Sequence, residues 1–171
     1  LAQAPDLVVI AIGTNDAHGQ RGPAAYEADL VAMLSALDEA GLPNVRPPLT
    51  LDVADASWET GPVDAVFSAN TAHIMHWPVV CAMIAGVGRI LHADGDFLLY
   101  GPFNYDGRHT SESNARFDLS LRMNDPGMGI RDFEAVQEQL VRAGLTLAAD
   151  HAMPANNRLL VFRRTASTPP G

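Results

Sequence analysis

Apolar runs and helical repeats alternate along most of the chain. The unbroken apolar run at residues 7–12 lies between Pro5-Asp6 and Gly13, which predicts a strand buried on both faces. Residues 63–69 and 96–100 predict two more buried strands. Residues 46–53 predict a short strand, and its two consecutive prolines cannot donate to a ladder, so we expect it at a sheet edge.

Apolar positions at helical spacing predict four helices. One runs from Pro23 until Gly41 and Pro43 end it. A second opens at Pro78, and the others are expected near residues 115–123 and 132–143. The second helix carries an apolar face of Val80, Met83, Ile84, Val87 and Leu91. Its two glycines, at positions 86 and 88, should weaken it by about 1 kcal/mol each unless something packs closely there.

The end of the chain predicts a hairpin. Residues 145–153 and 158–164 are expected as strands, and the short connection between them requires an antiparallel pair. We expect one α/β domain over residues 1–164, followed by a disordered tail at 165–171. The predicted fold is a Rossmann-like three-layer sandwich, with a mostly parallel sheet that ends in this hairpin.

Such sheets bind ligands at the carboxyl ends of their strands, where the strand order reverses. If the strand at 46–53 lies outside the strand at 7–12, and the strand at 63–69 lies on its other side, the reversal has a definite position. It falls between Gly13-Thr-Asn-Asp16 and Asn70-Thr-Ala-His73. This crevice is the predicted site.

The composition of the chain limits the classes of partner that we expect. The 171 residues carry a formal net charge of −9 without a basic stripe, so nucleic acid is not expected as a partner. Cys81 is the single cysteine, which excludes a disulfide framework, and we expect it to be a buried helix residue. No apolar stretch is long enough for a membrane span and no signal sequence opens the chain, so we expect a cytoplasmic protein.

Several motifs from residue 41 to residue 164 occur in one order in a known family. The sequence there resembles a domain-of-unknown-function family of class I methyltransferase-like proteins. The matching stretches are Leu51-Asp-Val53, Asp64-Ala-Val-Phe-Ser-Ala-Asn70, His73-Ile-Met-His-Trp77, Tyr100-Gly-Pro-Phe103, Gly107-Arg-His-Thr-Ser111, Gly129-Ile-Arg-Asp132 and Met153-Pro-Ala-Asn-Asn157.

The resemblance implies that S-adenosylmethionine is the cofactor and that a small molecule is the substrate. It places Asp52 near the adenine, and Asn70 and His73 in the crevice beneath the sulfonium. Candidate catalytic residues are Asn70, His73 and His109. The predicted cofactor-binding residues are Gly13, Asn15, Asp16, Asp52 and Asn70, and the predicted substrate-binding residues are Tyr100, Arg108, His109, Asn114 and Asn156. No metal site is expected.

The sequence departs from the family pattern at its front end. A class I enzyme should begin with a strand, a glycine-rich loop, a helix and a second strand that ends in an acidic residue. Only one strand–helix unit precedes Gly41, and Gly13-Thr-Asn-Asp16 does not supply three glycines. The first strand–helix unit is therefore expected to be missing or replaced, which could impair cofactor binding.

Residues 5–40 resemble a different family. The run Pro5-Asp-Leu-Val-Val-Ile-Ala-Ile-Gly-Thr-Asn-Asp16 is similar to the Gly-x-Asn-Asp block of SGNH/GDSL hydrolases. That resemblance implies that Asn15 donates to an oxyanion. No serine nucleophile block precedes it, and we interpret the Asp106/His109 spacing as coincidence. A hybrid chain joined near Ala40-Gly41 is the resulting hypothesis, with residues 1–40 from one ancestor.

Each candidate residue also has a structural interpretation. Asn15 and Asp16 can cap a turn, the loop that holds Arg108 and Asn114 can be a structural network, and Asn156 can simply form the hairpin turn. Three functions stay open: a methyltransferase-like domain, a catalytically inert recombined domain and an esterase that uses Asn15. A sheet edge exposed by the missing unit could also support a homodimer.

Overall fold

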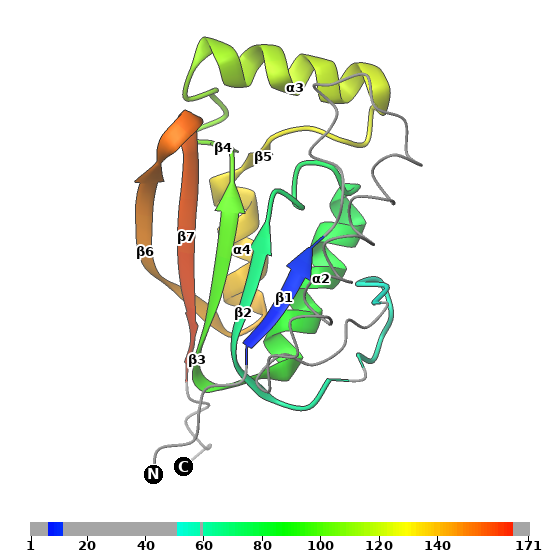
Figure 1. The fold of residues 1–171 in the computed structure, drawn as a ribbon, viewed down its shortest axis with the longest axis vertical. Coiled ribbons are helices and arrows are strands. Elements are labelled where there is room, and N and C mark those ends of the chain that lie inside the picture. Colours follow the sequence, from blue (N-terminus) through cyan, green and yellow to red (C-terminus); the bar gives the residue numbers. More distant parts are fainter. Residues whose placement is uncertain (1–6, 12–50, 59, 166–171) are drawn as a thin grey trace, which may run out of the picture. The chain divides into compact units, whose positions relative to one another are not determined.

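The structure is a computed structural model that describes residues 7–11, 51–58 and 60–165 (Figure 1). The chain divides into two compact units, Ile12–Asp52 and the remainder, Leu1–Ala11 with Val53–Gly171. The elements below all belong to the latter unit. The helix predicted at residues 23–40, the tail at 166–171 and most of the strand predicted at 46–53 lie outside the described residues.

A five-stranded mixed sheet forms the centre of this unit. Its order is β1-β2-β3-β7-β6, which comprises Leu7–Ala11, Val63–Ala69, Leu91–Gly101, Asn157–Arg164 and Leu145–Met153. The predicted strands at 7–12, 63–69, 96–100 and the terminal hairpin are thus confirmed. The first two strands pair in parallel, Val8 opposite Val66, as the predicted neighbourhood of 7–12 and 63–69 requires.

The sheet is less parallel than the sequence suggested. Within the described sheet, β1–β2 and β2–β3 pair in parallel, but β3–β7 and β7–β6 pair antiparallel. The reason is the connection Pro154–Asn156, which is too short for a crossover and can only reverse the chain direction. The described sheet is therefore mixed, with β7 opposite in direction to the other four strands, and the description "mostly parallel" is not confirmed.

Helices α2 (Trp77–Ile90) and α4 (Phe133–Arg142) cover one face of the sheet and contact each other (Figure 1). Helix α3 (Glu112–Asn124) lies beyond the ends of β2 and β3 (Figure 1). A test of the expected three-layer arrangement depends on the helix at 23–40, which is outside the described residues. None of the described helices has the length and apolar character that crossing a bilayer requires.

The core lies between α2, α4 and the sheet. The α2 face predicted from the sequence is buried at Val80, Met83, Ile84 and Val87, but Leu91 begins β3 instead of ending the helix. The chain turns from helix to strand at that point, so the helical spacing of Leu91 was misleading. Opposite this face, the sheet buries Phe97, Leu99, Leu160 and Phe162.

Close packing accounts for both glycines of α2. A β-carbon on Gly86 would lie 2.2 Å from the indole of Trp58, and one on Gly88 would lie 2.8 Å from the Ala143 carbonyl. Glycine lowers the helix propensity at these two positions, but it lets Trp58 and the end of α4 pack directly against the helix backbone. Trp58 is thus a buried packing residue of this helix face.

Two further points position the site. A short parallel ladder joins β4 (Phe103–Asn104) to β5 (Arg131–Asp132) beyond the end of β3. Residues 51–53, the described end of the strand predicted at 46–53, are irregular. That part of the prediction was wrong, and prolines 47 and 48 already gave the segment little capacity to join a ladder.

Candidate functional site

The carboxyl ends of β2 and β3 bring Asn70 and Gly101 side by side. The backbone N–H of Asn70 donates to the Tyr100 carbonyl at 2.8 Å, which extends the β2–β3 ladder by one residue. Asn70 then turns into the left-handed region with φ 57°, a conformation that asparagine tolerates better than most residues. This turn ends the strand and directs the chain into residues 71–76.

The segment after Asn70 is held from several sides. The Ser68 and Thr71 hydroxyls are 2.5 Å apart, and the Thr71 carbonyl accepts from the N–H groups of Ile74 and Met75. Arg131 donates from Nε to the Ala72 carbonyl at 3.0 Å and from a terminal nitrogen to the Met75 carbonyl. A half-buried guanidinium thus fixes the turn that carries His73.

His73 is buried without a hydrogen bond to its ring. Its exposed fraction is 3%, and its ring packs edge-on against Phe117 with centroids 5.2 Å apart. Within the described residues, the imidazole nitrogens have no hydrogen-bond partner. Burial, together with the nearby charge of Arg131, lowers the pKa of His73 to about 4, so the ring is neutral at neutral pH.

Asn70 and His73 converge on the space beside Gly101. A β-carbon on Gly101 would lie 3.7 Å from Asn70 Oδ1 and 3.8 Å from His73 Nδ1. The side chain of Asn70 also has no hydrogen-bond partner among the described residues. The structure therefore brings together two of the three predicted catalytic candidates around a residue without a side chain.

The third candidate, His109, belongs to a separate hydrogen-bonded network. Its Nδ1 is 2.8 Å from Asn104 Oδ1, and its Nε2 is 3.9 Å from Asp118 Oδ2. Asn104 in turn donates from Nδ2 to the Ile130 carbonyl at 3.4 Å. The Asp106/His109 pair that an esterase would need is not formed, since the ring of His109 contacts Asn104 and Asp118.

Asp118 is the centre of this network. It is buried, accepts from the backbone N–H of Ile130 at 2.6 Å, and pairs with Arg122 Nε at 2.8 Å. The carboxylate raises the pKa of Arg122 through this hydrogen bond. Sequence reasoning missed Asp118 and Arg131, because the contacts that place them in the site are to the Ile130 N–H and to the Ala72 and Met75 carbonyls, which no local spacing identifies.

The predicted substrate-binding asparagines tie the hairpin to α3. Asn114 is buried, and its Nδ2 donates to Thr110 Oγ1 at 2.9 Å and to the Asn156 carbonyl at 3.2 Å. Asn156 adopts φ 58° in the hairpin turn and donates to Ser113 Oγ at 3.1 Å. These contacts favour the structural interpretation of both residues, although their role in substrate binding stays a prediction.

Tyr100 and Arg108 occupy different surroundings. Tyr100 is half-buried and its hydroxyl accepts from Asn157 Nδ2 at 3.1 Å, whereas the side chain of Arg108 is exposed. A cavity of about 170 Å³ lies between the loop and the hairpin. Its lining residues are Thr110, Ala152, Met153, Asn156, Asn157 and Arg158. It is small for a complete ligand and suits part of one.

The remaining predicted cofactor residues cannot be placed against this site. Gly13, Asn15 and Asp16 lie outside the described residues, and Asp52 is an exposed residue of the other unit. In the described part of the chain, no three His, Cys, Asp or Glu side chains gather closely enough to hold a metal ion.

Solved methyltransferases share this fold. An O-methyltransferase family protein from Burkholderia thailandensis is 19% identical, with a TM-score of 0.69 over 83% of this chain and 42% of its own. The mitomycin 7-O-methyltransferase MmcR is 14% identical, with a TM-score of 0.66 over 82% and 40%. The S-adenosylmethionine-dependent methyltransferase SibL is 19% identical, with a TM-score of 0.64 over 81% and 41%.

These likenesses establish a methyltransferase-type Rossmann-like α/β fold and no more, because the identities are low. The chain spans about two fifths of the length of the structures it matches.

A family model matches residues 21–164. The match begins well before Gly41 and includes the predicted helix at 23–40, so neither the join near Ala40-Gly41 nor the SGNH resemblance gains support from it. It covers most of the chain. The chain therefore belongs to the family described as Protein of unknown function (DUF938).

Proposed function

We propose that this chain is an S-adenosylmethionine-dependent methyltransferase-like domain that acts on a hydroxyl group of a small molecule. Two independent facts support the proposal. The solved structures with the same fold include enzymes named as O-methyltransferases and as S-adenosylmethionine-dependent. The carboxyl edge of the sheet, where open α/β folds bind their ligands, carries two polar side chains, Asn70 and His73, that have no hydrogen-bond partner among the described residues.

The observation that carries the proposal is the state of Asn70 and His73. His73 is buried, Asn70 is half-buried, and neither side chain has a hydrogen-bond partner among the described residues. Polar groups of this kind can accept hydrogen bonds from a ligand or donate them to it. Both side chains direct polar atoms toward the space beside Gly101. A ligand that supplies the missing hydrogen bonds explains why the sequence places two such groups there.

The residues present fit S-adenosylmethionine. A neutral amide and a neutral imidazole do not repel a positive sulfonium, and the low pKa of His73 keeps its ring uncharged. When bound, the cofactor would supply a methyl group on a positively charged sulfur. Asn70 and His73 would hold the cofactor at the carboxyl edge, and the main work of the protein is positioning. The roles of Gly13, Asn15, Asp16 and Asp52 stay predictions.

His109 is the proposed proton acceptor for the acceptor hydroxyl. Because Asn104 Nδ2 donates to the Ile130 carbonyl, Asn104 Oδ1 faces His109 and accepts the Nδ1 proton. This hydrogen bond leaves Nε2 as the basic nitrogen, with Asp118 nearby to stabilise a positive ring. His109 is one-third exposed, so a substrate could reach it.

Calorimetric titration of S-adenosylhomocysteine tests the cofactor site. We expect the wild-type chain to bind S-adenosylhomocysteine. Asn70→Gly should weaken this binding by about tenfold or more, because the variant loses one charge-assisted or buried hydrogen bond to the ligand. Glycine keeps the left-handed conformation of residue 70, so the variant removes only the amide. Asn124→Ala, at the end of α3, is the matched control and should bind like the wild type.

The outcomes separate the alternatives. Absence of heat with the wild type at about millimolar ligand would sink the cofactor proposal. Binding without any formation of S-adenosylhomocysteine from S-adenosylmethionine, across a panel of small phenols and alcohols, would support the catalytically inert domain instead.

A further inference from the structure

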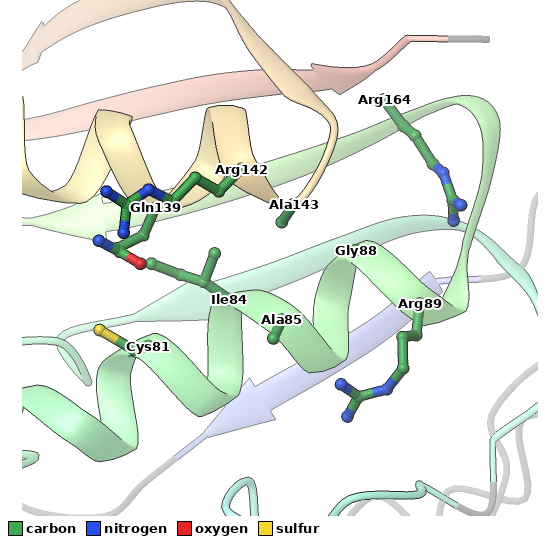
Figure 2. A pocket seen from close by; sticks show the side chains of 9 residues that line it. All are labelled: Cys81, Ile84, Ala85, Gly88, Arg89, Gln139, Arg142, Ala143 and Arg164. Carbon is green, nitrogen blue, oxygen red and sulfur yellow. The ribbon is translucent and has the colours of Figure 1, made fainter. Parts of the chain in front are cut away.

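A second cavity lies at the other end of the sheet from the candidate site. It has a volume of about 350 Å³ and opens between the C-terminal halves of α2 and α4 (Figure 2). Its floor is made of small and apolar side chains, including Ile84, Ala85 and Ala143, with Gly88 where α4 approaches. The size is within the range of small-molecule sites.

Three arginines surround this cavity in a chain whose net charge is −9. Arg89 comes from α2, Arg142 from α4 and Arg164 from the end of β7. Figure 2 shows Arg142 and Gln139 on the side of Ile84, and Arg164 near the end of α2 that carries Arg89. Cations from three separate elements thus line one hollow, with Arg142 at one end and with Arg89 and Arg164 toward the other (Figure 2).

The negative charges near the cavity offset only part of this positive charge. Arg89 and Arg142 occupy the last turns of α2 and α4, where each C-terminus carries about half a negative charge. Glu138 adds one carboxylate, paired with Arg142 at 2.6 Å. The two helix ends and Glu138 together offset about two of the three positive charges, so a positive potential remains at the cavity.

The guanidinium groups also retain unused donors. Each arginine carries five N–H donors. Arg142 uses one of its terminal nitrogens on Glu138, Arg164 donates to the Leu91 carbonyl, and the guanidinium of Arg89 has no partner among the described residues. These free donors match the paired oxygens of a carboxylate or phosphate group.

We propose that this cavity binds a small anion in which a carboxylate or phosphate group is attached to an apolar body. The guanidinium groups hold the oxyanion, and Ile84, Ala85 and Ala143 pack against the body. The site is distinct from the proposed methyl-transfer site and does not depend on that function.

Cys81 provides a sensor inside the cavity. It lines the hollow, is half-buried and is the single cysteine of the chain. The expectation that it is fully buried was therefore wrong. Burial raises the pKa of its thiol, and the charges of Arg142 and Arg131 oppose that rise. The thiol therefore responds to Arg142, one of the three cations that the proposal invokes.

Alkylation of Cys81 by iodoacetate and by iodoacetamide, followed by mass spectrometry, measures the local potential. The measured quantity is the rate constant for iodoacetate divided by the rate constant for iodoacetamide. Changes in the accessibility of Cys81 cancel in this ratio, because the two reagents differ mainly in charge. We expect Arg142→Gln and Arg89→Gln each to lower the ratio about threefold through loss of a nearby charge. Arg116→Gln removes the same charge from exposed α3 and should leave the ratio unchanged. Equal ratios in the wild type and Arg142→Gln would overturn the proposal.

Protection of Cys81 tests binding directly. Phenyl phosphate and benzoate, at up to about 10 mM, should slow the reaction with neutral iodoacetamide in a saturable way, and benzyl alcohol should not. The anion that protects at the lower concentration decides between phosphate and carboxylate. Absence of protection by both anions, or equal protection by benzyl alcohol, would also overturn the proposal.

Discussion

Two sets of polar side chains lie at the same end of the sheet, and they differ in how their hydrogen bonds are satisfied. Asp118 has a backbone N–H and an arginine as partners, and His109 has Asn104. Asn70 and His73 have no side-chain hydrogen bonds within the described residues, although His73 is as deeply buried as Asp118. The first set stabilises the fold, and only Nε2 of His109 stays accessible for the proposed proton transfer. The second is available to a ligand.

The difference teaches where to look for function. A satisfied network repays the desolvation of its members within the protein, so its presence has a structural explanation. Asn70 and His73 have no such partners among the described residues, although His73 is buried and Asn70 is half-buried. Two polar side chains beside a glycine at the carboxyl edge of the sheet are therefore available to a ligand.

Asp118→Ala should have the largest effect on stability. The variant leaves the Ile130 N–H without an acceptor and removes the partner of Arg122. We expect a loss of about 3 kcal/mol in the free energy of unfolding, measured by urea denaturation. Glu112→Ala removes an exposed carboxylate from the first turn of the same helix and should cost about 0.5 kcal/mol or less. Similar losses in the two variants would show that the Asp118 network has no special weight.

His73 should give the fold an acid sensitivity of its own. Its pKa is about 4 in the folded chain against an ordinary value of 6.5, so the unfolded state binds a proton more readily between these values. The contribution of His73 to the free energy of unfolding is therefore fully present above about pH 6.5 and declines as the pH falls toward 4.

Between pH 7 and pH 5 the wild type should lose about 2 kcal/mol through His73. His73→Gln lacks the titrating group. Between pH 7 and pH 5 its free energy of unfolding should therefore fall by about 2 kcal/mol less than that of the wild type, whatever its absolute stability. Urea denaturation at the two pH values gives both differences. Parallel declines in wild type and variant would mean that His73 is not held neutral by burial.

Much of the fold could be predicted because it depends on local patterns. The apolar run at 63–69 is the strand β2 with the same bounds, and the hairpin follows from a connection too short for a crossover. The errors lie where tertiary context overrides local pattern. Leu91 has helical spacing yet starts β3, and residues 51–53 are irregular where the apolar pattern predicted the end of a strand.

The site was only partly predictable for the same reason. Asn70 and His73 follow a predicted strand, so the topology rule located them. Arg131 could not be found in this way, because its acceptors lie at Ala72 and Met75, more than fifty residues earlier in the chain. The cavity between α2 and α4 was equally hidden, because Arg89, Arg142 and Arg164 are distant in sequence and each looks like an ordinary surface cation.

Asn70→Gly should have the smallest effect on stability. It is also the most direct test of the difference between the hydrogen-bonded set and the set available to a ligand. Asn70 adopts φ 57° and its side chain has no partner among the described residues, so glycine loses no hydrogen bond and enters the left-handed region without strain. The free energy of unfolding should change by about 0.5 kcal/mol or less, the balance between relief at this φ and greater freedom of the unfolded chain. Asn114→Ala breaks two hydrogen bonds of a buried amide and should cost about 2 kcal/mol under the same urea conditions. If Asn70→Gly destabilises the chain as much as Asn114→Ala, then Asn70 is part of the structural network, and the distinction between satisfied and available side chains no longer identifies the site.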